Sequence, residues 1–340
     1  MGNSQYFRWS SGLTSDSEKN GHREKDAATR LMVAREPEEG AIEIMHSPKY
    51  VIEESAKIYC IGSCFAREIE KALVIHGISV TSNELNPDKF GVVSSMHPSH
   101  RAPVGIMTKF NSFSMGQEIQ RVVKSEGVEE FPSLVKLDSG EYWDSQLHNV
   151  PPQSLNTMSK IRRMVDANLQ GLCQADVVVL TLGLTEMWWD KDLGIALNGA
   201  PYKMKNIVKS GVGRYEFRNA SFEEVRSNLI EMINNLRKLN SSVKVLLTVS
   251  PVPLQRTFSG VDVIVANSHS KSLLRSVIAD VESRYASVDY FPSYEIVSNS
   301  SRRFAWQHDQ RHVNPKLIKK ITQKFIEGYI LQDTDLSLRA

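Results

Sequence analysis

A serine and a histidine–aspartate pair lie far apart in the chain, and together they are residue types of nucleophilic catalysis. Ser63 stands between a short apolar run and a helical pattern, where the free N–H groups and dipole of a helix N-terminus favour developing negative charge. Asp309 and His312 lie three residues apart in a polar loop near the end of the chain. A serine, a histidine and an acid perform nucleophilic acyl transfer. Spacing alone leaves two simpler interpretations open: Ser63 as a helix cap, and His312 as a solvated loop residue.

The elements that must bring these residues together alternate between strand and helix. This alternation predicts an α/β fold with a doubly wound, mostly parallel sheet. In such a sheet ligands bind beyond the carboxyl ends of the strands, which is where Ser63 stands. The expected strands are 58–61, 78–80, 176–182, 243–249 and 288–291, and the expected helices are 65–76, 157–172, 221–239, 268–285 and 315–331.

The chain divides into a polar arm and one folded domain. Residues 1–45 are rich in Ser, Glu, Lys and Arg without a sustained apolar period, which predicts an extended arm. Residues 46–335 carry the strand and helix pattern of a single domain. Residues 82–155 are too long for one loop, so we expect short helices there and an insertion over the sheet.

Composition excludes several classes of protein. The 340 residues include 41 Lys and Arg against 39 Asp and Glu, a net charge of +2, which disfavours a nucleic-acid partner. Three cysteines lack zinc-ligand spacing, and no Gly-rich phosphate loop is present, so we expect neither a metal nor a nucleotide cofactor. The chain has no apolar run of membrane-spanning length and no signal-peptide pattern, which predicts a cytoplasmic protein without a membrane span. The oligomeric state stays open.

Five motifs, in order, resemble those of one known family. The segment Gly62–Ala66 reads GSCFA, the signature of the GSCFA family, and the resemblance extends from about residue 6 to residue 320. The family is similar to the SGNH, or GDSL-like, hydrolases, which implies a flavodoxin-like three-layer α/β/α sandwich. It also implies that Ser63 is the nucleophile and that Asp309 and His312 form the DxxH pair of the triad. The other four segments are 181–188, 247–254, 270–275 and 289–296.

The sequence departs from the wider superfamily at the third motif. A GxND motif places an Asn in the oxyanion hole, but here Gly183 and Leu184 are followed by Thr185. A Thr hydroxyl donates one hydrogen bond, with a shorter reach than an amide. We therefore expect an oxyanion hole of Gly183 and Thr185, with Asn111 as a further donor. The alternative for Asn111 is a turn or capping residue.

Three further residues near these motifs have two interpretations each. Glu186 and Trp188 are expected to bind substrate, Trp188 because aromatic rings pair well with the apolar faces of ligands. Glu186 can instead hold neighbouring loops through backbone N–H groups, and Trp188 can anchor a loop. Cys64 is a rival nucleophile, but directly after Ser63 its side chain is expected to point away into the helix packing.

These residues predict ester chemistry. With water as the acceptor the protein is a serine esterase, and with a sugar hydroxyl it is an O-acyltransferase. Carbohydrate or polysaccharide esters are the substrates that the resemblance implies. The alternative is a non-catalytic glycan-binding or assembly protein that keeps the fold, and the Thr at position 185 supports it.

Overall fold

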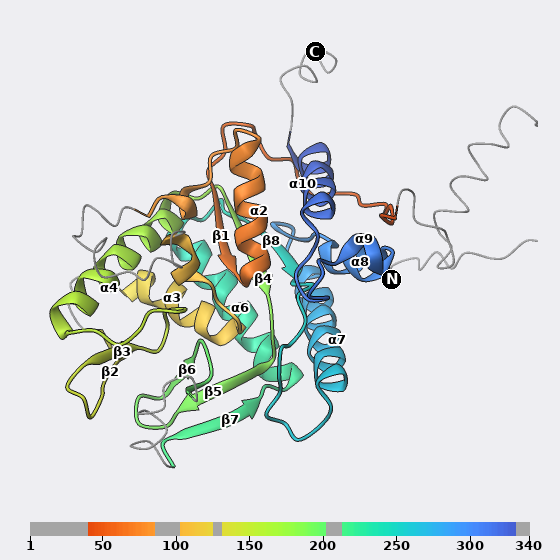
Figure 1. Ribbon diagram of the computed structural model, residues 1–340. Coiled ribbons are helices and arrows are strands. Elements are labelled where there is room, and N and C mark those ends of the chain that lie inside the picture. The colour runs from red at the N-terminus through yellow and green to blue at the C-terminus, as the bar shows by residue number, and fades with distance from the viewer. Residues whose placement is uncertain (1–39, 86–102, 125–130, 202–212, 331–340) are drawn as a thin grey trace, which may run out of the picture.

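Four parallel strands form the centre of the molecule (Figure 1). The computed structural model describes residues 40–85, 103–124, 131–201 and 213–330, so most of the expected polar arm at 1–45 lies outside the described residues. The order of the sheet is β1-β4-β8-β9, in which β1–β4 and β4–β8 are parallel neighbours as predicted. The loops that follow these three strands therefore meet at one edge of the sheet. The strands are β1 (Ile58–Gly62), β4 (Val177–Leu182), β8 (Lys244–Val249) and β9 (Val288–Tyr290).

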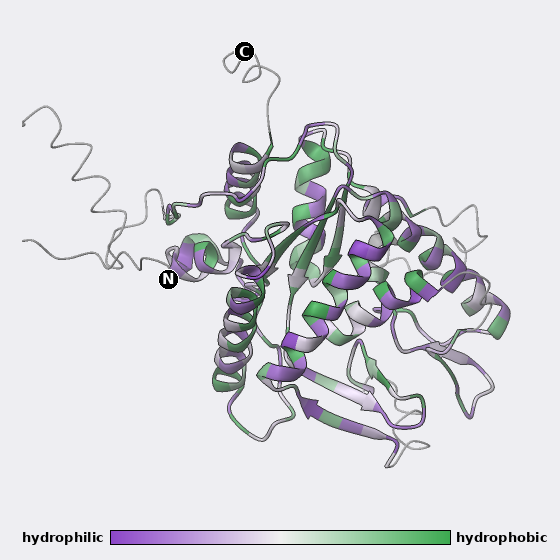
Figure 2. Ribbon diagram, turned by 180° about the vertical axis from the view of Figure 1, so that it is seen from behind, coloured by the Kyte–Doolittle hydropathy of each residue, from purple (hydrophilic) through white to green (hydrophobic). Residues whose placement is uncertain are grey.

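Alternating residues of the strands pack against helices on opposite faces of the sheet, which confirms a three-layer α/β/α sandwich. Val178 and Leu180 belong to one core cluster, whereas Val177 and Val179 belong to the other. Green and purple residues intermix along the helices in Figure 2, as amphipathic helices require. The first cluster includes residues of α3 (Ser112–Lys124), α4 (Leu155–Leu169), α6 (Phe222–Leu239) and α7 (Val263–Glu282); the second includes residues of α2 (Cys64–Ile75), α8 (Ser293–Asn299), α9 (Arg302–Ala305) and α10 (Pro315–Tyr329).

Capping residues define where the predicted helices begin. The capping box of Ser221 and Glu224 starts α6, and Asn314 caps α10 ahead of Pro315. The start expected at residue 268 is wrong: α7 begins at Val263, after the cap Asp262. The helix start was not predicted because the first turns of α7 expose apolar side chains, so they lack the amphipathic pattern of a surface helix; Ile264, for example, is 76% exposed. Within the described ranges, no helix combines the length and apolarity that a membrane span requires.

One strand prediction needs correction, and one sheet was not predicted. The strand expected at 78–80 is reduced to one parallel bridge between Ile58 and Val80, at the outer edge of β1. The loop after β4 is only three residues long, 183–185, before the chain enters β5 (Glu186–Asp190), the centre of an antiparallel sheet. Its neighbours are β6 (Ile195–Leu197) and β7 (Tyr215–Asn219). The tight turn at Gly183 sends the chain away from the parallel sheet, which the apolar pattern did not predict.

The described part of 82–155 contains short elements, as expected. Its longest element, α3, contributes Met115 and Ile119 to the core cluster that covers one face of the sheet. The region thus supplies part of a layer. The other elements in or at the start of this region are η1 (Thr81–Asn83), η5 (Pro103–Met107), β2 (Leu134–Lys136) and β3 (Tyr142–Asp144). A further short helix, η6 (Gln170–Gln174), follows α4.

Candidate active site

Ser63 lies directly after β1 and caps α2. Its Oγ accepts a hydrogen bond of 3.3 Å from the N–H of Phe65 and donates one of 2.8 Å to the Oγ of Ser250, which follows β8. Gly62 makes this turn possible, since its φ is +154° and a Cβ there would lie 2.5 Å from the carbonyl oxygen of Thr181. The helix N-terminus therefore sits beside the Ser63 hydroxyl, as its sequence position predicted.

A pocket of about 160 Å³ opens where the loops after β1, β4 and β8 meet. These loops contribute Ser63, Cys64, Gly183 and Ser250 to its wall, and Arg311 reaches it from the loop before α10. Asn111, Glu186 and Trp188 also line it. Two aromatic side chains also line it, Phe217 from β7 of the antiparallel sheet and Phe258 from the loop between β8 and α7. The pocket therefore joins residues from both sheets.

Asp309 and His312 form a pair on one tight loop. The Nδ1 of His312 hydrogen bonds to Oδ2 of Asp309, while Oδ1 accepts 3.0 Å hydrogen bonds from the backbone N–H groups of Arg311 and His312. The His312 backbone and ring contacts, then the Arg311 N–H, hold the pKa of the Asp309 carboxyl well below its usual range. Because the Asp309 carboxylate occupies Nδ1 of His312, Nε2 is the ring nitrogen of His312 that is available to accept a proton.

The loop of His312 lies beside the pocket that contains Ser63. Among the described residues, the hydroxyl of Ser63 hydrogen bonds to Ser250 and not to His312. The neighbouring Arg311 lines the pocket with Ser63, so the Asp309–His312 loop borders the site. Contact between Ser63 and His312 therefore stays a prediction.

The three expected oxyanion donors occupy different environments. Gly183 lines the pocket, and only a glycine fits there because a Cβ would lie 2.4 Å from the carbonyl oxygen of Phe110. The Thr185 hydroxyl instead donates to Oδ1 of Asn219 at 2.7 Å, and Thr185 is outside the pocket wall. Thr185 turns away because the chain is already entering β5.

Asn111 lines the pocket but acts as a structural residue in this geometry. Its Nδ2 donates to the carbonyl oxygen of Leu197 at 2.9 Å, and its Oδ1 accepts from the N–H of Ser114 at 2.8 Å. This is the capping alternative of the sequence analysis. The oxyanion role of Asn111 stays a prediction. In that role the second hydrogen of Nδ2 would have to donate to the oxyanion, because the first is bound to Leu197.

Sequence reasoning missed Lys271, a fully buried residue of α7. Its Nζ donates a hydrogen bond of 2.8 Å to the carbonyl oxygen of Gly183, and the preceding Ser270 accepts from the N–H of Thr185 at 2.8 Å. Burial lowers the pKa of Lys271 to about 7, an effect that nearby Cys64 opposes. The family-like segment 270–275 was the available signal, but nothing in it indicated which residue mattered.

The prediction for the side chain of Cys64 needs a correction. It packs partly against the core as expected, but it also lines the pocket beside Ser63 rather than pointing wholly away. Burial raises the pKa of its thiol, although Arg311 and Lys271 counteract part of this effect. A protonated thiol is a weak nucleophile, so the geometry leaves Ser63 the better candidate.

Glu186 and Trp188 lie in β5 and line the pocket. Glu186 is 8% exposed and accepts a hydrogen bond from the hydroxyl of Thr257, so it holds a neighbouring loop, though through a side chain and not backbone N–H groups. Trp188 makes edge contacts with Phe217 and Phe258, with ring centroids 5.8 and 5.2 Å apart. These three rings form an aromatic wall.

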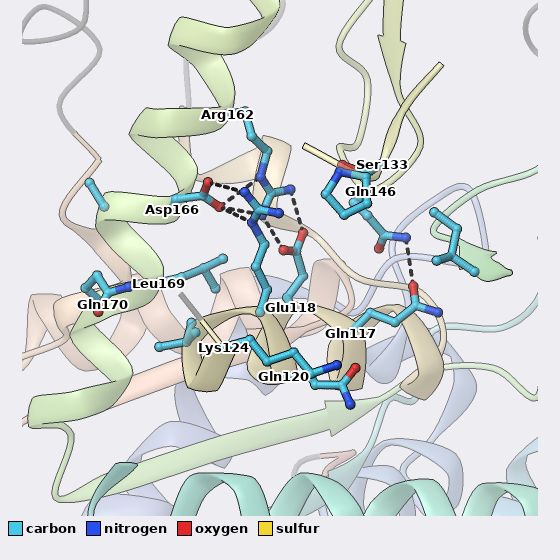
Figure 3. A pocket seen from close by; sticks show the side chains of 15 residues that line it. Gln117, Glu118, Gln120, Lys124, Ser133, Gln146, Arg162, Asp166, Leu169 and Gln170 are labelled. Carbon is cyan, nitrogen blue, oxygen red and sulfur yellow. Dashed lines mark hydrogen bonds and ion pairs between the residues drawn. The ribbon is translucent and has the colours of Figure 1, made fainter. Parts of the chain in front are cut away.

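A buried charge network positions the segment 109–111 beside the site. In Figure 3, Arg162 of α4 points toward Glu118 of α3 and toward Asp166. Glu118 also accepts from Lys109 Nζ at 2.7 Å, and the backbone N–H of Lys109 donates to the carbonyl oxygen of Gly62 at 2.7 Å. Burial would raise the pKa of Glu118, but Arg162 and Lys109 outweigh it and lower the pKa to about 2. The network therefore connects α3 and α4 to the turn that carries Ser63.

Comparison with known proteins identifies one family. The model of the GSCFA family matches residues 57–325. No curated protein sequence matches the chain. Solved structures that it resembles include an acetyl esterase mutant with acetate ion (12% identity, 80% of this chain, 97% of that chain, TM-score 0.35). A carbohydrate esterase family 3 from Talaromyces cellulolyticus (13%, 79% and 94%, TM-score 0.35) and a Clostridium thermocellum family 3 carbohydrate esterase (11%, 80% and 94%, TM-score 0.30) are also similar. Structural similarities with TM-scores this low do not bear on the chemistry of the site.

Proposed function

We propose, from the premise that this chain belongs to the GSCFA family over residues 57–325, that it is a serine esterase or O-acyltransferase acting on acyl esters. The observation that carries the proposal is the Asp309–His312 pair, already formed on a loop in which Arg311, directly before His312, shares a pocket with Ser63. A nucleophile at a helix N-terminus and an oriented histidine are what acyl transfer requires.

The proposed reaction begins when the Ser63 hydroxyl turns from Ser250 toward His312. The Ser63 oxygen attacks the ester carbonyl while its proton passes to Nε2 of His312, and Asp309 stabilises the resulting imidazolium. Collapse of the tetrahedral intermediate releases the alcohol, which takes that proton and leaves an acyl group on Ser63. Water or a sugar hydroxyl then removes the acyl group, with His312 as the base. In this proposal the backbone N–H groups at the N-terminus of α2 and at the turn of Gly183, both at the pocket wall, stabilise the oxyanion.

A carbohydrate ester suits the pocket as the substrate. The aromatic wall of Trp188, Phe217 and Phe258 offers ring faces and edges to a sugar ring, and Gln255 adds an amide group to the same pocket. Mixed aromatic and amide walls are typical of small-molecule sites.

The test measures hydrolysis of 4-nitrophenyl acetate by the wild type and by Ser63→Ala and His312→Gln. Each variant should lose activity by about 1,000-fold or more. The control is His308→Gln, an exposed histidine in the same loop, which should keep wild-type activity. Folded Ser63→Ala protein with undiminished turnover would contradict the proposal. Addition of an oligosaccharide acceptor, followed by mass spectrometry, separates the two reactions: an acylated sugar indicates transfer, and acetate alone indicates hydrolysis.

One observation favours a second candidate, a non-catalytic glycan-binding protein. The Thr185 hydroxyl and one Asn111 amide hydrogen, both expected in the oxyanion hole, are bound to Asn219 and Leu197. Calorimetry with an oligosaccharide distinguishes this candidate from the enzyme. Binding without acyl-ester turnover or a Ser63 adduct would support the second candidate and contradict the first.

A further inference from the structure

Arg311 reaches the pocket from the loop that holds the Asp309–His312 pair. Its backbone N–H donates to Oδ1 of Asp309 at 3.0 Å, which fixes the loop on which the side chain is carried. The side chain lines the pocket together with Ser63 and Cys64, and its charge acts on the Cys64 thiol. The guanidinium is therefore close to the proposed nucleophile.

The guanidinium of Arg311 has no acidic partner in the part of the chain that the structure describes. Its Nε is buried without a hydrogen-bond acceptor, and among the described residues no carboxylate forms an ion pair with the side chain. An arginine cannot lose its proton to relieve this situation, and a buried unsatisfied N–H destabilises the folded state. An anionic group that enters the pocket with the ligand would satisfy it.

The pocket cannot supply that anion from its own wall. Glu186 is the one carboxylate among the pocket residues that the structure describes, and it already accepts a hydrogen bond from Thr257. A guanidinium without a carboxylate partner favours a negatively charged ligand, and its planar fork matches a carboxylate.

We infer that Arg311 is a specificity-determining residue that binds a carboxylate of the substrate, so that the ester acted on carries an acid group, such as the carboxylate of an acidic sugar. This inference rests on the proposed function, because it places the carboxylate beside the ester that Ser63 attacks. The aromatic wall would contact the ring that bears both groups.

The experiment compares two esters that differ by a carboxylate, 3-acetoxybenzoate and phenyl acetate. In the wild type and in Arg311→Met, kcat/KM is measured for both. The ratio of kcat/KM for the charged ester to kcat/KM for the neutral ester should be about 10- to 100-fold lower in the variant, mainly because KM for the charged ester rises. This fold-change corresponds to the loss of one hydrogen bond to a charged group. Arg311→Lys should restore part of the ratio, and the matched control Arg303→Met, at an exposed arginine of α9, should leave it unchanged.

Two results would overturn the inference. An equal loss for both esters would mean that Arg311 acts on the ester carbonyl or on folding, and an unchanged ratio would mean that it does not recognise the carboxylate. If the wild type turns over neither ester, with or without an oligosaccharide acceptor, the proposed function fails, and calorimetry with 3-hydroxybenzoate still tests Arg311. Binding to the wild type that Arg311→Met abolishes supports the carboxylate site, whereas equal binding or no binding contradicts it.

Discussion

The Nζ of Lys271 donates a hydrogen bond of 2.8 Å to the carbonyl oxygen of Gly183. The contact joins the middle of α7 to the turn that follows β4, at the wall of the pocket that contains Ser63. Lys271 is fully buried, and an uncharged carbonyl is its hydrogen-bond partner in the described part of the chain. A buried cation held in this way destabilises the fold at pH values where it carries its charge.

The buried Lys271 should make stability depend on pH. Its pKa is lowered to about 7, from 10.5, so between these values the unfolded chain binds a proton that the folded protein does not. The unfolding free energy contributed by this group therefore rises with pH across that window and is constant below it. Relative to Lys271→Met, wild-type stability should rise by about 1 kcal/mol per pH unit in the window. Urea denaturation of both proteins at several pH values measures this, and parallel curves would contradict it.

Breaking the buried charge network should destabilise the protein strongly. Glu118→Gln leaves Arg162 and Lys109 without their shared carboxylate in a region that excludes water. We expect a loss of about 3–5 kcal/mol in unfolding free energy. The matched control is Glu54→Gln, at an exposed position, which should change stability by less than about 0.5 kcal/mol. A loss in Glu118→Gln no larger than in the control would show that the network is not strongly stabilising.

Gly183→Ala should distort the site. The new Cβ would lie 2.4 Å from the carbonyl oxygen of Phe110, so the backbone of one of the two segments must move. We expect a loss of roughly 1–3 kcal/mol in stability, together with a fall in any esterase activity. Gly105→Ala is the control, because a Cβ there meets no atom within 4 Å. Thermal unfolding and turnover of 4-nitrophenyl acetate measure both effects; equal behaviour of the two variants would refute the prediction.

Cys64→Ala should separate serine from cysteine chemistry. Burial raises the pKa of the Cys64 thiol, so it stays protonated near neutral pH and should not replace Ser63. The variant should keep most of its activity and lose on the order of 1 kcal/mol of stability from lost packing. Mass-spectrometric mapping of an organophosphonate adduct should locate it on Ser63. An adduct on Cys64 in the wild type would contradict this assignment.

Much of the fold follows from local patterns. The β-branched run at 177–182 is buried on both faces, as a central parallel strand requires, and capping residues such as Ser221 start their helices at the expected places. The antiparallel sheet around β5 was not predictable in this way. Its strand 186–190 mixes acidic and aromatic residues, and its pairing with residues 215–219 depends on contacts distant in sequence.

The sequence by itself determined the order of the parallel strands and the main helices, the helix-cap position of Ser63 and the close pairing of Asp309 with His312, because these depend on neighbouring residues. Only the tertiary structure decided that Thr185 faces Asn219, that Lys271 is buried beneath Gly183 and that Arg311 shares a pocket with Ser63. The reason is physical: burial, desolvation and hydrogen bonding between side chains far apart in the chain arise when the layers pack, and no local pattern encodes which polar group then meets which partner.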